Sequence, residues 1–216
     1  SRNCSDGPLI MVQIYAGSGY RQENIDYAVN ALGDDAMLTD LQGMDLDSHL
    51  HPFSNFEDLS VRGALVMKKA AGVHVQDVDG REYIDAMAGL WCCDVGYGRT
   101  EIATAIAEQA HELAFYHSFF GMATEPTIRL ADRLKRLVPW SISKVFFGLS
   151  GSDANDTQTK LIWLYNNLLG RPEKTKILSR HMGYHGITLG ASSLTGLPTV
   201  HAQMNLPLPG FLHLSM

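Results

Sequence analysis

The sequence predicts an α/β fold that contains a parallel sheet. Residues 144–179 have the order strand, helix, strand, because short apolar runs at 144–148 and 175–179 flank a long helical pattern. Parallel strands need a crossover of a dozen or more residues between them, and a helix commonly supplies it. Amphipathic helical patterns at 100–115 and 124–139 precede this unit, as expected for an α/β domain.

The first clear element along the chain is a β-hairpin between residues 73 and 85. Val73 and Val75 alternate with polar residues, and Asp79-Gly80 is typical of a tight hairpin turn. Residues 1–47 contain no comparable pattern. Their Gly17-Ser18-Gly19 stretch lacks the third glycine of a dinucleotide-binding fingerprint, so we interpret it as a loop.

Capping residues mark the predicted helices. We expect Thr100 to cap the first helix and Thr124 the second, with Pro126 in the first turn of the second helix and Pro139 at its end. The helix after residue 151 ends at Gly170, a residue type suited to a helix C-terminus. A loop and a helix follow near residue 184, and the run FLHLS near residue 211 predicts a further strand.

Composition narrows the class of protein. A net charge of −6 and the absence of Lys/Arg runs argue against nucleic acid as a partner. No apolar run reaches the 18 or so residues that span a bilayer, so we expect no membrane association. The three cysteines, Cys4, Cys92 and Cys93, offer no disulfide framework, which favours a reducing compartment and predicts a cytoplasmic location.

The turn Ser150-Gly151-Ser152 is a candidate anion site. It lies between a predicted strand and a predicted helix, where first-turn amides lack intrahelical partners and the helix dipole favours negative charge. Gly151 would permit close approach of the backbone, and the serines would add hydroxyl donors, which suits a phosphate. Ordinary helix capping explains the same pattern, and no Walker sequence follows.

The sequence HMGYHG contains a second candidate site. His181 and His185 are four residues apart, but Gly183 and Gly186 indicate a loop, and no glutamate lies between the histidines. We therefore expect no metal site. Tyr184 could present its ring to a planar ligand, or it could be a surface aromatic in a turn.

Three further residues have both structural and functional interpretations. Trp91 lies in a glycine-rich loop and could belong either to the core or to a pocket. The aromatic stretch that includes Phe119 is more typical of a core. Cys92 has no base specified near it, and we interpret it as structural.

Several segments, in this order along the chain, resemble the class III aminotransferases, which use pyridoxal phosphate (PLP). The likeness is strongest to the omega-amino acid–pyruvate branch and extends from about His49 to the end. The segments that carry the resemblance are HPFSNFEDL, DVDGREYIDAMAGLWCCDVGYGR, FYHSFFGMATEP, VFFGLSGSDANDTQTKL and GRPEKTKILSRHMGYHGITLGASSLTG.

The resemblance implies a fold-type I PLP-dependent transferase that is incomplete. Residues 48–98 would form the first part of the small domain, and 99–216 the first part of the large PLP-binding domain, with 1–47 unassigned. It also implies a homodimer with shared active sites. The roles carried over are phosphate binding by Gly151 and Ser152, ring stacking by Tyr184, and a substrate pocket that includes Phe53, Trp91 and, reaching the neighbouring subunit's site, Phe119.

The chain departs from the family pattern in three places. Asp153 stands where the family usually has Glu, and Leu149 stands where it often has Asn. The family's cofactor-linking lysine and its acidic partner for the pyridine nitrogen are also missing, because none of the chain's seven lysines lies in that sequence context. We therefore expect no catalytic residue within this chain.

The resemblance implies the front part of an enzyme that moves an amino group from an amine or omega-amino acid to a keto acid such as pyruvate. We expect the isolated chain to be inactive. Two alternatives stay open at this stage. The same fold supports other PLP enzymes such as aminomutases, and the chain could instead be a non-catalytic module that binds phosphate or forms dimers.

Overall fold

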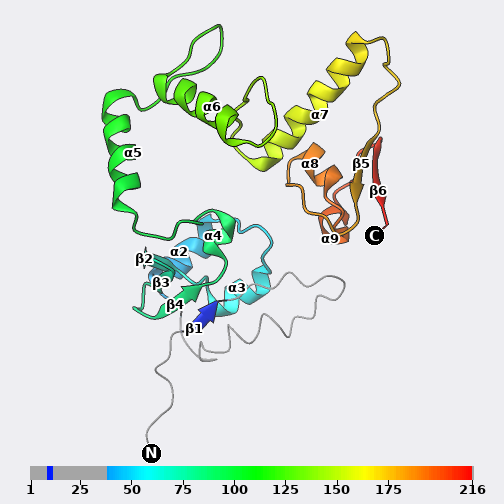
Figure 1. The fold of residues 1–216 in the computed structure, drawn as a ribbon. Helices are drawn as coiled ribbons and strands as arrows, with labels where there is room; N and C mark the ends of the chain where they lie inside the picture. The colour runs from blue at the N-terminus through cyan, green and yellow to red at the C-terminus, as the bar shows by residue number, and fades with distance from the viewer. Residues whose placement is uncertain (1–8, 12–37, 216) are drawn as a thin grey trace, which may run out of the picture. The chain divides into compact units, whose positions relative to one another are not determined.

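The computed structural model describes residues 9–11 and 38–215 (Figure 1). The chain divides into two compact units, Ser1–Phe115 and Tyr116–Met216. The predicted domain boundaries at 47/48 and 98/99 stay predictions, and the predicted loop at Gly17–Gly19 lies outside the described residues.

The first unit contains a four-stranded sheet in the order β1-β4-β3-β2 (Figure 1). Strands β2 (Met67–Ala71), β3 (His74–Asp77) and β4 (Glu82–Asp85) are antiparallel neighbours, and β1 (Leu9–Met11) lies parallel to β4. The predicted hairpin is confirmed as β3 and β4. Strand β1 was not predicted, because three residues carry too little periodicity and the partner lies about seventy residues away.

Asp77 fixes the hairpin from inside. Its carboxylate accepts hydrogen bonds from the backbone amides of Asp79, at 3.0 Å, and Arg81, at 2.8 Å. Its other oxygen accepts from the hydroxyl of Tyr83 at 2.7 Å, and Asp77, Tyr83 and Val75 are all buried. A buried carboxylate is stable here because donors surround it.

Helices α2 (Asp40–Ser48), α3 (Phe56–Arg62) and the short α4 (Ala88–Trp91) also belong to the first unit. Helix α2 starts with a capping box, in which Thr39 and Gln42 exchange side-chain and backbone hydrogen bonds. Helix α2 was not predicted from the sequence, since its residues form no apolar stripe. Its start was nevertheless readable from the Thr-x-x-Gln spacing.

The two amphipathic helices form as predicted, with one correction at a cap. Helix α5 (Thr100–Leu113) begins after Arg99, so the prediction that Thr100 caps it is wrong: Thr100 is the first helical residue. Helix α6 (Glu125–Leu137) begins after Thr124 as predicted. The Thr124 hydroxyl, however, pairs with the hydroxyl of Thr127 at 2.8 Å and caps no backbone amide.

The second unit contains a parallel pair of strands, but not the predicted pair of 144–148 with 175–179. Strand β5 (Ile177–Arg180) pairs in parallel with β6 (Phe211–Leu214), with Ile177 opposite Phe211. Helix α8 (Leu189–Leu194) lies against both strands and against α7 (Gly151–Leu168), and α9 (Pro198–His201) follows α8 (Figure 1). The core of this unit is built of small side chains around α8 and an aromatic ring from β6, namely Ala191, Ser192, Ser193, Thr195 and Phe211.

The predicted strand at 144–148 is wrong. The segment has no regular secondary structure, and Phe146 and Phe147 are 67% and 42% exposed. A strand requires a neighbour for its backbone hydrogen bonds, and no strand of the described ranges pairs with this segment. The segment therefore has the apolar residues of a strand but no neighbouring strand, in the described ranges, with which to form backbone hydrogen bonds.

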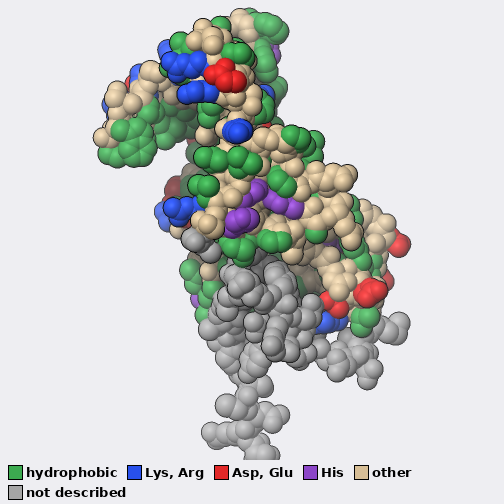
Figure 2. All heavy atoms as spheres, turned by 90° about the vertical axis from the view of Figure 1, so that its right-hand side faces the viewer, with side chains coloured by type: hydrophobic (Ala, Val, Ile, Leu, Met, Phe, Trp, Pro, Cys, Tyr) green, Lys and Arg blue, Asp and Glu red, His purple; other side chains and the backbone are tan. Residues whose placement is uncertain are grey.

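Apolar side chains lie open over much of the surface, as the face in Figure 2 shows. The fully exposed ones include Leu149, at 99%, and Phe120, at 93%. Within the described ranges, none of the helices combines the length and the hydrophobicity that a bilayer crossing requires. The exposed side chains are large and numerous for a monomeric surface, which favours further packing against protein.

Candidate phosphate and ring-binding site

The site begins at the N-terminus of α7, which Ser150 caps. Its backbone is extended (φ −160°, ψ 168°), and its Oγ accepts a hydrogen bond from the amide of Asp153 at 3.1 Å. Asp153 reaches back, and its Oδ2 accepts from the amide of Leu149 at 3.1 Å. The shorter Asp in place of Glu therefore still closes a reciprocal cap.

Capping leaves two amides at the helix start without an acceptor. The amide of Ala154 donates to the carbonyl of Ser150 at 3.0 Å, and that of Asp153 is taken by the Ser150 hydroxyl. No described residue accepts a hydrogen bond from the amides of Gly151 and Ser152. A Cβ placed on Gly151 would meet nothing within 4 Å. Two free amides and open space at a helix N-terminus suit an anion.

The loop at 182–187 lies directly against this helix start. The amide of Ile187 donates to Ser152 Oγ at 3.0 Å, and Asn155 Nδ2 donates to the carbonyl of His185 at 2.7 Å. Gly186 has φ +122°, and a Cβ there would lie 3.0 Å from Ser152 Cα and 2.9 Å from Ala191 Cβ. Only glycine permits this approach without displacement.

The same loop is tied on its other side to the residues that follow α8. The amide of His185 donates to Thr195 Oγ1 at 2.8 Å, and that hydroxyl donates to the carbonyl of Gly186 at 3.0 Å. The amide of Gly196 donates to the carbonyl of Gly183 at 2.8 Å. Tyr184 lies between these ties with 57% of its surface exposed. A fixed backbone with an open ring is the arrangement that a stacking residue needs.

Gly151, Ser152 and Tyr184 were predicted from the sequence, but the residues that bring them together were not. Asn155 and Gly186 join the loop to α7. Thr195 holds the loop through the hydrogen bond from its hydroxyl to the carbonyl of Gly186. Asp156, in α7, lies next to Gly190 of α8. Its Oδ1 is buried there and has no hydrogen-bond partner among the described residues. The glycines of the HMGYHG and TLGA stretches were the signal that could have revealed this packing.

The predicted pocket aromatics are exposed. Phe53 and Trp91 lie in the first unit, both with positive φ, and Phe119 lies in the second. Their joint role in a pocket stays a prediction. Positive φ at a bulky residue is uncommon and costs free energy, so the surrounding structure must hold these two backbones in place.

Asp85 braces the turn that carries Trp91. Its carboxylate accepts from the amides of Met87, at 3.0 Å, and Gly89, at 2.7 Å, and from the Tyr97 hydroxyl at 2.6 Å. The Tyr97 hydrogen bond, above all, lowers the pKa of Asp85 below its ordinary value of 3.8, against the opposing effect of burial. The same carboxylate raises the pKa of the Tyr97 phenol. This network borders a hollow of about 510 Å³ whose lining also includes Met67, Lys68, Lys69, Ala70, Val75 and Leu90.

Comparison with known proteins assigns the chain to a family. Residues 58–216 match the family model for class III aminotransferases. The chain belongs to the class III aminotransferases. This confirms the resemblance that the ordered sequence segments indicated, and the fold-type I architecture that it implied.

Relatives of this class III aminotransferase chain have more than one named activity. It is 40% identical over 180 residues to a putrescine–pyruvate aminotransferase of Pseudomonas aeruginosa. The matched region is 83% of this chain and 40% of that protein. It is 45% identical to a gamma-aminobutyrate transaminase of Solanum lycopersicum, with 85% of this chain and 35% of the relative covered. The chain thus spans well under half the length of these relatives.

Solved structures show the same partial overlap. The omega transaminase of Pseudomonas jessenii in complex with PMP superposes with a TM-score of 0.81 at 43% identity. The match covers 82% of this chain and 39% of that one. Class III aminotransferases are PLP-dependent, and the open N-terminus of α7 fits the phosphate of such a cofactor, because two amides and the Ser152 hydroxyl proton remain available to it.

Proposed function

We propose that this chain supplies the phosphate-holding and ring-holding part of a PLP-dependent aminotransferase. The observation that carries the proposal is that no described residue accepts from the amides of Gly151 and Ser152, which lie beside the fixed loop of Tyr184. PLP, when bound, acts as the electron sink of the reaction. The chain's own residues bind and orient it.

Each residue has a separate task in this proposal. The amides of Gly151 and Ser152 donate to the phosphate, and the Ser152 hydroxyl, which already accepts from Ile187, donates its remaining proton. The side chain of Leu149 has no polar group to offer the phosphate, whereas Asn at that position would have one. The backbone amides therefore supply a larger share of the phosphate binding. Tyr184 covers one face of the pyridine ring, and its backbone ties keep it from turning away.

We propose an amine with a terminal primary amino group as the donor and a keto acid such as pyruvate as the acceptor. Support comes from the relatives, which are named for putrescine with pyruvate and for gamma-aminobutyrate. Both donors carry the amino group at the end of an unbranched chain. Phe53, Trp91 and Phe119 are proposed to line the pocket for that chain, in a homodimer located in the cytoplasm.

We further propose that the chain by itself does not transaminate. Its lysines lie at 68, 69, 135, 144, 160, 174 and 176, and none stands in the family's cofactor-linking sequence context. The assay is formation of alanine from pyruvate with putrescine or gamma-aminobutyrate as donor, in the presence of PLP. Turnover above the rate of PLP alone would contradict this proposal.

Phosphate binding can be tested with a matched pair of variants at Gly151. This residue is the first of α7, and the extended backbone of Ser150 suits a following proline. Gly151→Pro therefore removes one amide donor without breaking the helix, whereas Gly151→Ala keeps the donor and enters open space. We expect Gly151→Pro to weaken PLP binding by about tenfold or more, because a hydrogen bond to a charged group is lost.

The measurement is calorimetric titration of the chain with PLP and, separately, with inorganic phosphate. Gly151→Ala should bind within about twofold of the unsubstituted chain, since its amide is intact. Equal affinity in the Pro and Ala variants would show that this amide does not hold the phosphate. An unsubstituted chain that binds neither compound would argue against a preformed site and favour the role of a dimer-forming module.

A further inference from the structure

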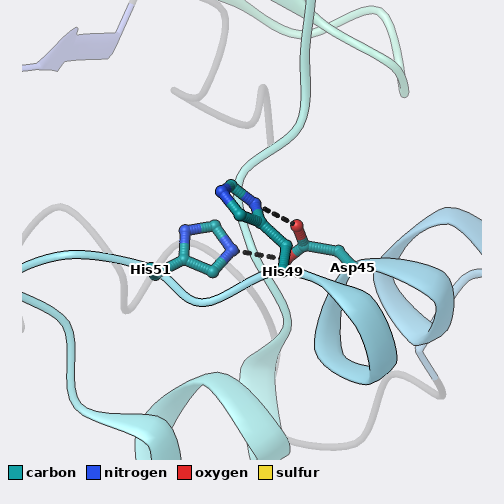
Figure 3. A group of neighbouring side chains, drawn as sticks. All are labelled: Asp45, His49 and His51. Atoms are coloured by element: carbon teal, nitrogen blue, oxygen red, sulfur yellow. Dashed lines mark hydrogen bonds and ion pairs between the residues drawn. The ribbon is translucent and has the colours of Figure 1, made fainter.

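Three side chains with metal-binding atoms converge at the end of α2 (Figure 3). Asp45 lies in the last turn of the helix, and His49, four residues later, is the residue that ends it. His49 Nδ1 lies 3.0 Å from Asp45 Oδ1, and His51 Nε2 lies 2.7 Å from Asp45 Oδ2. One ligand atom from each residue lies within 4.8 Å of the others.

The local fold explains why the three side chains meet. Residues four apart on a helix share a face, so Asp45 and His49 are neighbours along α2. The chain then turns out of the helix, and Pro52 restricts the backbone of His51 to an extended conformation. The two imidazole rings consequently stand 4.1 Å apart, both directed at one carboxylate (Figure 3).

We propose that Asp45, His49 and His51 form a binding site for a zinc-class divalent cation. Imidazole nitrogen and carboxylate oxygen are ligands that such ions prefer, and two histidines with one carboxylate leave a fourth position for water. No cation is needed to hold the rest of α2, whose start is fixed by its capping box. The site is additional to the aminotransferase function proposed above.

Little movement is needed to accept the ion. A tetrahedral zinc ion holds its ligands at about 2.0–2.1 Å, which puts neighbouring ligand atoms about 3.3 Å apart. The present nitrogen–oxygen separations of 3.0 and 2.7 Å must therefore widen slightly. His49 can turn because its side chain is 59% exposed, whereas His51 and Asp45, at 21% and 19%, offer a partly fixed base.

The carboxylate of Asp45 is placed to serve both histidines. Its two oxygens lie 3.0 Å from His49 Nδ1 and 2.7 Å from His51 Nε2. A bound cation takes the place of the ring proton that now lies between a histidine and the carboxylate, and that proton moves to the other ring nitrogen, so that each histidine binds as a neutral imidazole. The ion would tie the end of α2 to the segment that leads to Phe53, a predicted pocket residue.

The test is titration of the untagged full chain with Zn²⁺ alone, in competition with a fluorescent chelator. We expect one equivalent to bind, and His49→Ala, His51→Ala and Asp45→Asn each to weaken binding by about tenfold or more. His111→Ala removes an exposed histidine from α5 and Cys92→Ser an exposed thiol. These two matched controls should leave the affinity unchanged.

Either of two results of the zinc titration would overturn the proposal: no zinc binding by the unsubstituted chain, or binding that survives in the three ligand variants. The Co²⁺ complex of the unsubstituted chain gives a readout that needs no variant. Nitrogen and oxygen ligands should produce visible d–d absorption without the near-ultraviolet band of a cobalt–sulfur bond. A strong sulfur band would place the ion on the cysteines and contradict the assignment.

Discussion

At the scale of single residues, the phosphate site depends on how closely the loop of Gly186 approaches the start of α7. Ser152 and the loop of Tyr184 come together because Gly186 has no side chain and adopts φ +122°. Ser152 uses its hydroxyl to accept from Ile187 at 3.0 Å. One glycine therefore couples the phosphate-binding residue to the ring-stacking residue.

Gly186→Ala tests this coupling. The added methyl group would press on Ser152 and Ala191 at a backbone angle that alanine rarely adopts. We expect the free energy of unfolding in urea to fall by about 2–4 kcal/mol. Gly170→Ala is the matched control, since Gly170 also has positive φ but meets nothing within 4 Å, and should cost only about 1–2 kcal/mol. Equal losses would refute the close-contact explanation.

Asp85 should make stability depend on pH in one direction. Its pKa is lowered in the folded chain, so its contribution is complete above the ordinary value of 3.8 and disappears as pH falls through the lower folded value. Asp85→Asn should cost about 1–3 kcal/mol near neutral pH, because two amides and the Tyr97 hydroxyl lose their charged acceptor.

The check on Asp85 is urea unfolding between pH 3 and pH 7. The Asn variant should lose less stability than the unsubstituted chain as pH falls below about 4, because the titrating group is gone. Asp79→Asn, on the exposed turn between β3 and β4, serves as the control and should keep the original pH profile. Parallel profiles for Asp85→Asn and the unsubstituted chain would contradict this account.

At the scale of elements, the helix starts differ in how they are held. Helix α7 has a serine hydroxyl on the Asp153 amide and a returning carboxylate on the Leu149 amide. Helix α6 begins at a threonine whose hydroxyl pairs with another threonine instead. A hydroxyl residue stands at the N-cap of both helices, but only Ser150 of α7 caps a backbone amide with its side chain.

Ser150→Ala and Thr124→Ala form a matched pair for this difference. We expect Ser150→Ala to lower the free energy of unfolding by about 1 kcal/mol, because a first-turn amide loses its acceptor. Thr124→Ala should cost clearly less, since no backbone amide depends on its hydroxyl. Circular dichroism at the helical minimum during urea unfolding measures both, and a larger loss for Thr124→Ala would show that the cap assignment is wrong.

At the scale of the whole molecule, the surface carries apolar side chains that a monomer would ordinarily bury. Phe120 is 93% exposed, and the segment around Phe146 has no strand partner in the described ranges. Exposed apolar area of this kind drives association. We therefore expect the chain to be a dimer or larger at micromolar concentration in sedimentation velocity, and a monomer at every concentration would contradict this.

Local sequence patterns predicted the family, the α/β class, the hairpin and both amphipathic helices, while the phosphate-binding role of Gly151 and Ser152 stays a prediction. These features depend on local spacing, turn chemistry and motif order, which neighbouring residues carry. The other features depend on contacts between distant residues. The run at 144–148 has no strand partner in the part of the chain that the structure describes, β1 pairs with a distant strand, and Gly186 brings Tyr184's loop against Ser152. Pairing and close approach join residues far apart in sequence, so local patterns could not reveal them.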